Sequence, residues 1–131
     1  TGECSDRVRA ALPFTPEHQL NLSARYEQAV GDNGKVYVEA DARFVGRRFM
    51  SQSNLFWLPS YEQADFRAGY DFGQFSIEAF VENAFNNKAP RSGTSTVDYG
   101  YFDLNSFNLP RGALLSLAPK RTWGIKAGVK F

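Results

Sequence analysis

The chain has 131 residues, a formal net charge of +1 at pH 7 and an aromatic content of 15%. This length allows one domain at most, and the near-neutral charge argues against nucleic acid or an anionic membrane surface as an electrostatic partner. No segment approaches the roughly 18 consecutive apolar residues of a transmembrane helix. The high aromatic content is instead typical of β-sheet surfaces and membrane interfaces.

The N-terminal segment, residues 1–10, contains no apolar stretch of the kind found in signal peptides, and the chain does not begin with Met. These two features predict either a processed chain or a piece of a longer one. Cys4 is the single cysteine in the sequence. It could therefore form a disulfide only with a cysteine outside this chain.

Alternation of apolar and polar residues predicts five β-strands. In the first, Leu22, Ala24 and Tyr26 share one face and polar residues lie between them. A strand has a side-chain period of two, so this pattern separates an apolar face from a polar one. Asn33-Gly34 follows and is a strong hairpin signal. The predicted strands cover about residues 17–30, 35–48, 61–72, 75–85 and 121–131.

The connections between these strands alternate in length. Residues 31–34 and 73–74 form short turns, whereas residues 49–60 and 86–120 form longer connections. The longest is rich in Gly, Ser, Asn, Asp and Pro, with short apolar pieces that could extend the flanking strands. Outer-membrane β-barrels have short periplasmic turns and longer extracellular loops. The sequence therefore predicts an all-β, antiparallel meander of about five transmembrane strands, with both longer connections outside and the C-terminus in the periplasm.

The predicted polar face carries many charged side chains, and opposite charges across strands contribute roughly 0.2–1 kcal/mol per pair. The expected pairs are Arg25 with Glu39 or Asp41, depending on register, and Arg67 with Glu78 or Glu82. Such residues could hold an internal domain or line a path through a barrel. A hydrated wall with self-paired charges is the simpler interpretation. The set comprises Arg25, Glu39, Asp41, Arg43, Arg47, Asp65, Arg67, Glu78, Glu82, Lys126 and Lys130.

The charged face alone would suit either a water-filled lumen or the solvent around a soluble sheet. The apolar face favours a membrane barrel, because its aromatic residues cluster near strand ends as they do in the girdles of such barrels. One predicted girdle contains Tyr26, Tyr70, Phe72, Phe75 and Phe131, and the other contains Phe49, Phe56, Trp57, Tyr61 and Trp123.

Four stretches of the chain, taken in this order, resemble the C-terminal part of the β-barrel of TonB-dependent receptors. They are residues 12–22, 58–61, 80–87 and 118–131. The third resembles a motif that ends the penultimate strand, with Ala84 in place of the usual leucine and Asn86 in place of the usual aspartate. The fourth resembles a Pro-Arg-Thr-Tyr-Gly start to the last strand, with Lys120 inserted and Trp123 in place of tyrosine.

The resemblance implies a barrel of about 22 strands around an N-terminal plug domain, in the outer membrane of a Gram-negative bacterium. This chain would supply the last five strands and the last extracellular loops, and the plug would be absent from it. Five strands cannot close in lipid, because both edges would leave unpaired backbone groups. The partners implied are membrane lipid, the remaining barrel and plug, TonB and the barrel-assembly machinery. The implied substrates are siderophores, haem, cobalamin or glycans.

Two groups of residues are candidates for function. In the long loop, an aromatic and charged mixture suits substrate contacts, although an ordinary solvated loop is an equal alternative. In the last strand, the alternation ending on an aromatic resembles the signal that the assembly machinery reads by strand pairing. The alternative is an aromatic that simply ends the strand at the interface. The loop candidates are Arg91, Asp98, Tyr99, Tyr101, Phe102 and Arg111, and the signal candidates are Trp123, Ile125, Ala127, Val129 and Phe131.

No cofactor, metal site or enzyme is expected. His18 is the only histidine and has no second His or Cys nearby to complete a metal site. Catalytic motifs with a nucleophile or a phosphate loop are missing. The favoured function is active outer-membrane transport. The alternatives are a small autonomous outer-membrane or periplasmic β-protein with a structural or ligand-binding role, and a soluble lipocalin-like carrier.

Overall fold

The computed structural model describes residues 12–51, 56–97 and 111–130. These residues fall into two compact units. The first, here called the sheet unit, comprises the described residues within Gln19–Val45, Tyr61–Lys88 and Pro119–Phe131. The second, here called the connecting unit, comprises those within Thr1–His18, Gly46–Ser60 and Ala89–Ala118. Each unit is considered by itself.

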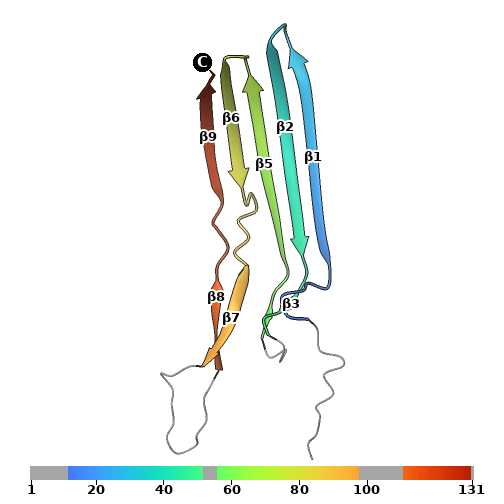
Figure 1. Ribbon diagram of the computed structural model, residues 1–131, viewed down its shortest axis with the longest axis vertical. Helices are drawn as coiled ribbons and strands as arrows, with labels where there is room; N and C mark the ends of the chain where they lie inside the picture. The colour runs from blue at the N-terminus through green and yellow to red at the C-terminus, as the bar shows by residue number, and fades with distance from the viewer. Residues whose placement is uncertain (1–11, 52–55, 98–110, 131) are drawn as a thin grey trace, which may run out of the picture. The chain divides into compact units, whose positions relative to one another are not determined.

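The sheet unit is one antiparallel sheet whose strand order follows the chain (Figure 1). Each strand pairs with the next along this order, so the sheet is a meander, and the predicted all-β antiparallel fold is confirmed. Across the described ranges, no helix is long and apolar enough to span a membrane. The five strands are β1 (Gln19–Val30), β2 (Gly34–Val45), β5 (Tyr61–Asp71), β6 (Phe75–Glu82) and β9 (Thr122–Val129).

Tight turns join two of the four strand pairs. Residues 31–33 connect β1 to β2, and Gly31 has a φ of 68°, in the left-handed region that glycine adopts without steric cost. Gly34, although part of the predicted Asn-Gly signal, already belongs to β2 and lies opposite Val30. Between β5 and β6, Phe72 N donates to Phe75 O at 2.7 Å, and Gly73 has a φ of 85°.

The strand register gathers the apolar residues of all five strands on one face. One row across the sheet runs through Tyr26, Val38, Ala68, Ala79 and Ile125. This face is open: Tyr26 is 64% exposed and Ile125 is 68% exposed. Val45 and Ala64 are the only buried hydrophobic residues described in the sheet unit. The sheet is therefore a single layer without a core of its own, and its apolar face requires an apolar environment.

The connecting unit contains two short hairpins. β3 (Arg48–Phe49) pairs with β4 (Trp57–Leu58), and β7 (Ser92–Val97) pairs with β8 (Arg111–Ser116). Leu58 is fully buried there, and Met50 is buried as well. The β7–β8 hairpin lies within the predicted long loop, whose short apolar and β-branched pieces pair with each other rather than with β6 and β9.

Candidate functional site

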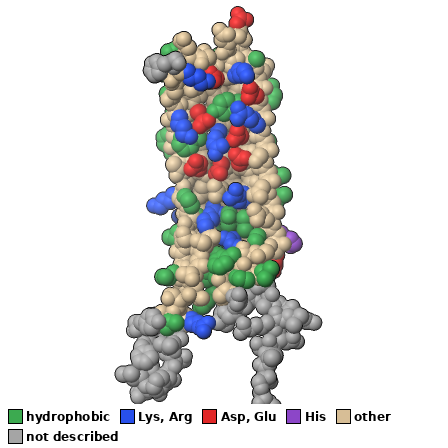
Figure 2. All heavy atoms as spheres, in the orientation of Figure 1, with side chains coloured by type: hydrophobic (Ala, Val, Ile, Leu, Met, Phe, Trp, Pro, Cys, Tyr) green, Lys and Arg blue, Asp and Glu red, His purple; other side chains and the backbone are tan. Residues whose placement is uncertain are grey.

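The polar face of the sheet unit collects side chains from all five strands. Figure 2 shows the charged side chains gathered on this face, with Lys and Arg alternating with Asp and Glu. The alternation is a consequence of register, because residues that lie opposite each other across strands share a face. In the middle row, Arg25, Glu39 and Arg67 are direct partners on β1, β2 and β5.

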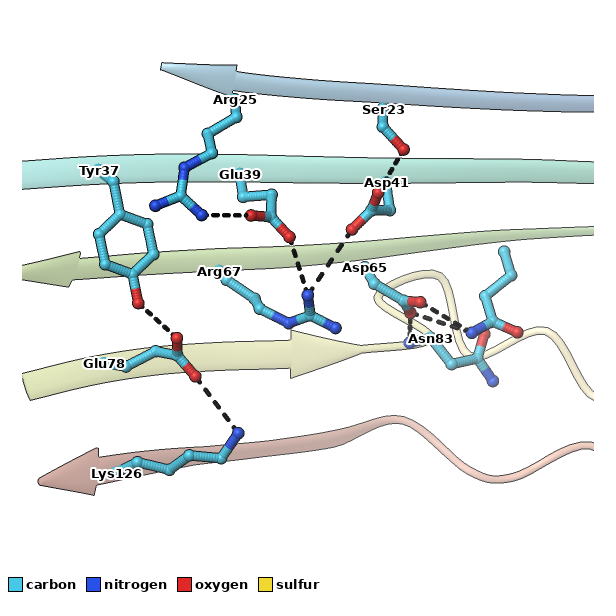
Figure 3. Close-up of polar contacts among 11 residues, drawn as sticks. Ser23, Arg25, Tyr37, Glu39, Asp41, Asp65, Arg67, Glu78, Asn83 and Lys126 are labelled. Carbon is cyan, nitrogen blue, oxygen red and sulfur yellow. Dashed lines mark hydrogen bonds and ion pairs between the residues drawn. The ribbon is translucent and has the colours of Figure 1, made fainter. Parts of the chain in front are cut away.

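Glu39 is the centre of an ion-pair cluster (Figure 3). Arg25 Nη1 donates to Glu39 Oε2 at 3.0 Å, and Arg67 Nη1 donates to Glu39 Oε1 at 2.8 Å. Of the two partners expected for Arg25, the register therefore selects Glu39. Since one carboxylate receives two guanidinium groups from the neighbouring strands, Glu39 ties β1, β2 and β5 together on the polar face.

The expected pairing of Arg67 with Glu78 or Glu82 is wrong. The tight turn at residues 73–74 places Arg67 opposite Phe80, and the Arg67 side chain pairs instead with β2. Glu78 lies opposite Gly69. Its carboxylate accepts hydrogen bonds from the Tyr37 hydroxyl and, at 3.3 Å, from Lys126 Nζ. The number of residues in the turn sets the register of β5 against β6. This register, which the sequence left open, decides the partners of Arg67 and Glu78.

A shallow depression of about 250 Å³ lies on the polar face. Asp41 and Asp65 lie directly opposite each other there, an arrangement that is unfavourable for like charges. Ser23 Oγ donates to Asp41 at 2.6 Å, and Gln63 Nε2 donates to Asp65 at 3.0 Å. Both carboxylates therefore have partners within the sheet, and Arg43 and Arg67 in the same lining balance their charge. Its polar lining consists of Asn21, Ser23, Asp41, Arg43, Gln63, Asp65 and Arg67.

Asn83 joins the end of β6 to the segment that leads into β9. It is 2% exposed, and its backbone N donates to Asp65 Oδ1 at 2.7 Å. Its Nδ2 donates to the carbonyl oxygens of Pro119 at 2.8 Å and Asn87 at 3.0 Å, while its Oδ1 accepts from Asn87 N at 2.9 Å. Asn83 has a φ of 50°, which asparagine tolerates better than most residues. This hydrogen bonding explains the asparagine in the stretch 80–87.

Replacing Glu39 should weaken the sheet on its polar side. Glu39→Gln keeps the shape of the side chain but removes the charge shared by Arg25 and Arg67, so we expect a loss of about 1 kcal/mol in the free energy of unfolding. Glu27→Gln is the matched control, because the Glu27 side chain is 41% exposed against 21% for Glu39. Its loss should be smaller. Urea titrations of the purified barrel in lipid measure both, and equal losses would contradict the central role of Glu39.

The structure separates the described members of the predicted loop site. Arg91 lies at the start of β7, where its N donates to Ser116 O at 2.9 Å and its carbonyl oxygen accepts from Arg48 Nη2. Arg111 begins β8 and lies opposite Val97, at the other end of the same hairpin. The remaining predicted loop contacts, Asp98, Tyr99, Tyr101 and Phe102, lie outside the described residues.

The predicted assembly signal follows the apolar face of β9. Trp123, Ile125, Ala127 and Val129 lie opposite apolar residues of β6, and Trp123 is 75% exposed. Phe131 lies outside the described residues. Arg47, predicted with the charged lumen set, belongs instead to the connecting unit, where it pairs with Glu17 at 3.4 Å.

Sequence reasoning did not single out Tyr37, Phe80 or Asn83 as functional. Tyr37 and Phe80 are aromatic residues on the polar side of the alternation, and this mismatch with the pattern was the available signal. Asn83 lies in the stretch 80–87, whose resemblance to a family motif is the signal that the sequence carries for it. Within the part of the chain that is described, no three His, Cys, Asp or Glu side chains are placed to hold a metal ion.

A sheet with one exposed apolar face and one charged, self-paired face is what the wall of a water-filled membrane barrel requires. The family model for "TonB dependent receptor-like, beta-barrel" matches residues 5–84, more than half of the chain. This chain belongs to the TonB-dependent receptor β-barrel family. Family members are outer-membrane transporters rather than enzymes, and in general the barrel works with a plug domain and with TonB. The comparison with curated proteins gave no match, and neither did the comparison with solved structures.

Proposed function

We propose that this receptor chain supplies the last five strands of a barrel of about 22 strands, through which a scarce nutrient enters the periplasm. The observation that carries the proposal is the division of the sheet into an open apolar face and a charged face. In lipid every backbone group must be paired, so β1 and β9 would each continue the hydrogen bonding with another barrel strand. The polar face would then line the lumen, toward the plug.

The direction of the strands in the membrane follows from the connections. Both tight turns, residues 31–33 and 73–74, lie at the end of the sheet where β9 ends. Short turns are periplasmic in outer-membrane barrels, so the C-terminus would be periplasmic and the long connections extracellular. An epitope inserted between Lys88 and Ala89 should be labelled on intact cells. One inserted between Asp32 and Asn33 should be labelled only after permeabilisation, and the reverse result would contradict this direction.

The transported nutrient is proposed to be a ferric siderophore, haem, cobalamin or a glycan. The extracellular loop 86–120 would contribute substrate contacts through Arg91, Asp98, Tyr99, Tyr101, Phe102 and Arg111, an aromatic and charged mixture suited to such ligands. Disruption of the gene in its native host, followed by uptake assays with one radiolabelled member of each class, tests this. We expect one class to be lost, and to be lost equally when TonB is removed. Unchanged uptake of all four would contradict the proposal.

An immunoblot of the outer membrane from the same host tests the alternative of a small autonomous β-protein. The barrel proposal expects a band several times larger than the 14.7 kDa of this chain. A band at 14.7 kDa would favour the autonomous protein, with strand edges closed by oligomerisation.

Deletion of Phe131 should lower the yield of assembled barrel severalfold. We propose that Trp123, Ile125, Ala127, Val129 and Phe131 present the apolar side of an edge strand to the assembly machinery, which would bind it by strand pairing. The measurement is the fraction of outer-membrane protein with the heat-modifiable mobility of a folded barrel. Phe131→Tyr, which keeps an aromatic terminus, is the control. A normal yield of assembled barrel after the deletion would contradict the proposed assembly signal.

A further inference from the structure

Two aromatic residues on the polar face lie directly opposite glycines of the next strand. Tyr37 on β2 is the register partner of Gly69 on β5, and Phe80 on β6 is the partner of Gly124 on β9. A Cβ atom added to Gly69 would lie 2.4 Å from Tyr37 Cε1, and one added to Gly124 would lie 2.8 Å from Phe80 Cζ. Both rings therefore occupy the space that a side chain on the glycine would fill.

A cation lies over each of these rings, and the Glu78 carboxylate joins the Tyr37 hydroxyl to the cation that lies over Phe80. Arg25 Cζ lies 4.6 Å from the centroid of the Tyr37 ring, and Lys126 Nζ lies 4.6 Å from the centroid of the Phe80 ring. Figure 3 shows Tyr37 reaching across β5 to Glu78, which also accepts from Lys126. These residues form one continuous arrangement across β1, β2, β5, β6 and β9. We call it the aromatic belt; its members are Arg25, Tyr37, Gly69, Glu78, Phe80, Gly124 and Lys126.

The aromatic–glycine pairs occur at the two strand junctions that no tight turn controls. The β1–β2 and β5–β6 pairs are closed by the turns at 31–33 and 73–74, and a short turn fixes hairpin register. Within the described register, neither pair has an aromatic residue opposite a glycine. Residues 46–60 separate β2 from β5, and residues 83–121 separate β6 from β9. Connections of that length do not fix the register, so contacts between the strands must set it.

The apolar pattern cannot supply that register by itself. A slip of one residue would turn the apolar side chains toward the lumen, but a slip of two residues keeps every residue on its face. Such a slip would place Tyr37 opposite Arg67 or Asp71, and Phe80 opposite Thr122 or Lys126. In the slipped alignments, each of these residues would place a side chain in the space that the ring fills against glycine. Only glycine accommodates the ring, which explains glycine in the interior of β5 and β9 despite its weak packing.

We propose that the two aromatic–glycine pairs of the aromatic belt are register locks, which select the correct alignment of the strands joined by long connections during barrel assembly. The proposal needs only the barrel wall and holds whichever nutrient is carried.

The first test measures the yield of heat-modifiable barrel when the full gene product is expressed in its native host. Gly69→Ala should lower the yield by about fivefold or more, because the added Cβ and the ring cannot share the space. Gly112→Ala is the control, since a Cβ there meets nothing within 4 Å. Once Tyr37 has been replaced by alanine, Gly69→Ala should cause no further loss. Equal yields for Gly69→Ala and Gly112→Ala would overturn the proposal.

The second test reads the register directly by disulfide trapping in a Cys4→Ser background. Ala42 and Ala64 are register partners, so the pair Ala42→Cys and Ala64→Cys reports the native alignment. The pairs Ala42→Cys with Phe66→Cys, and Ala42→Cys with Glu62→Cys, report slips of two residues in either direction. With Tyr37 intact, only the native pair should cross-link. In Tyr37→Ala, the slipped pairs should cross-link as well.

Tyr37→Phe keeps the ring and should keep both the native cross-link and the yield. Native cross-links alone with normal yield in Tyr37→Ala would overturn the proposal. If Tyr37→Ala leaves no assembled barrel, normal assembly of Tyr37→Phe supports the lock, because the ring is then the part that matters. An equal loss in Tyr37→Phe would overturn it.

Discussion

Ala68→Arg should destabilise the assembled barrel by about 2–4 kcal/mol, the cost of a guanidinium on the lipid face near the middle of the bilayer. Ala68 lies in the central part of β5, between Val38 and Ala79, and is exposed on the apolar face. No acidic residue shares its row, which also contains Tyr26 and Ile125. The arginine would thus meet hydrocarbon without a partner.

Ala29→Arg is the matched control for Ala68→Arg. Ala29 is an exposed alanine on the polar face of β1, opposite Lys35. The same substitution there places its charge in water beside one like charge, and should cost no more than about 1 kcal/mol. Urea titrations of both variants in lipid vesicles, followed by the loss of heat-modifiable mobility, give the two values. Equal losses would mean that the apolar face does not contact lipid.

Asn83→Ala should also be strongly damaging, with a loss of about 2–3 kcal/mol in the free energy of unfolding. The substitution removes three part-buried hydrogen bonds of a side chain that is itself 2% exposed, one to the Pro119 carbonyl and two to the backbone of Asn87, and each such bond contributes about 0.5–1.5 kcal/mol. Alanine also adopts a φ near 50° less readily than asparagine does.

Two further variants separate these contributions. Asn83→Gly removes the same hydrogen bonds but accepts the backbone conformation, so it should be less damaging than Asn83→Ala by up to about 1 kcal/mol. Asn83→Asp keeps the acceptor for Asn87 N but loses both donated bonds and adds a charge close to Asp65. Asn33→Ala, in the exposed turn between β1 and β2, is the control. If Asn83→Ala unfolds at the same urea concentration as Asn33→Ala, the side chain of Asn83 does not hold the end of β6.

Much of the polar site could be foreseen from the local pattern. Charged residues at every second position of a strand lie on the same face of that strand, whatever its neighbours are. Arg25 was correctly expected to pair with β2, with Glu39 as one of two choices. The partners expected for Arg67 were wrong, because the true partners depend on which residues close the β5–β6 turn. The Asn83 contacts could not be foreseen, since they join a strand end to a segment more than 30 residues away along the chain.

The sequence by itself determined the class of fold, the two faces of the sheet, the tight turns and the family. Each of these follows from the period of two or from short motifs, which are local properties of the chain. Only the tertiary structure decided the alignment of β2 with β5 and of β6 with β9. A slip of two residues leaves the alternation unchanged, so the pattern cannot detect it. That choice depends on contacts such as Tyr37 against Gly69, which exist only once the strands lie side by side.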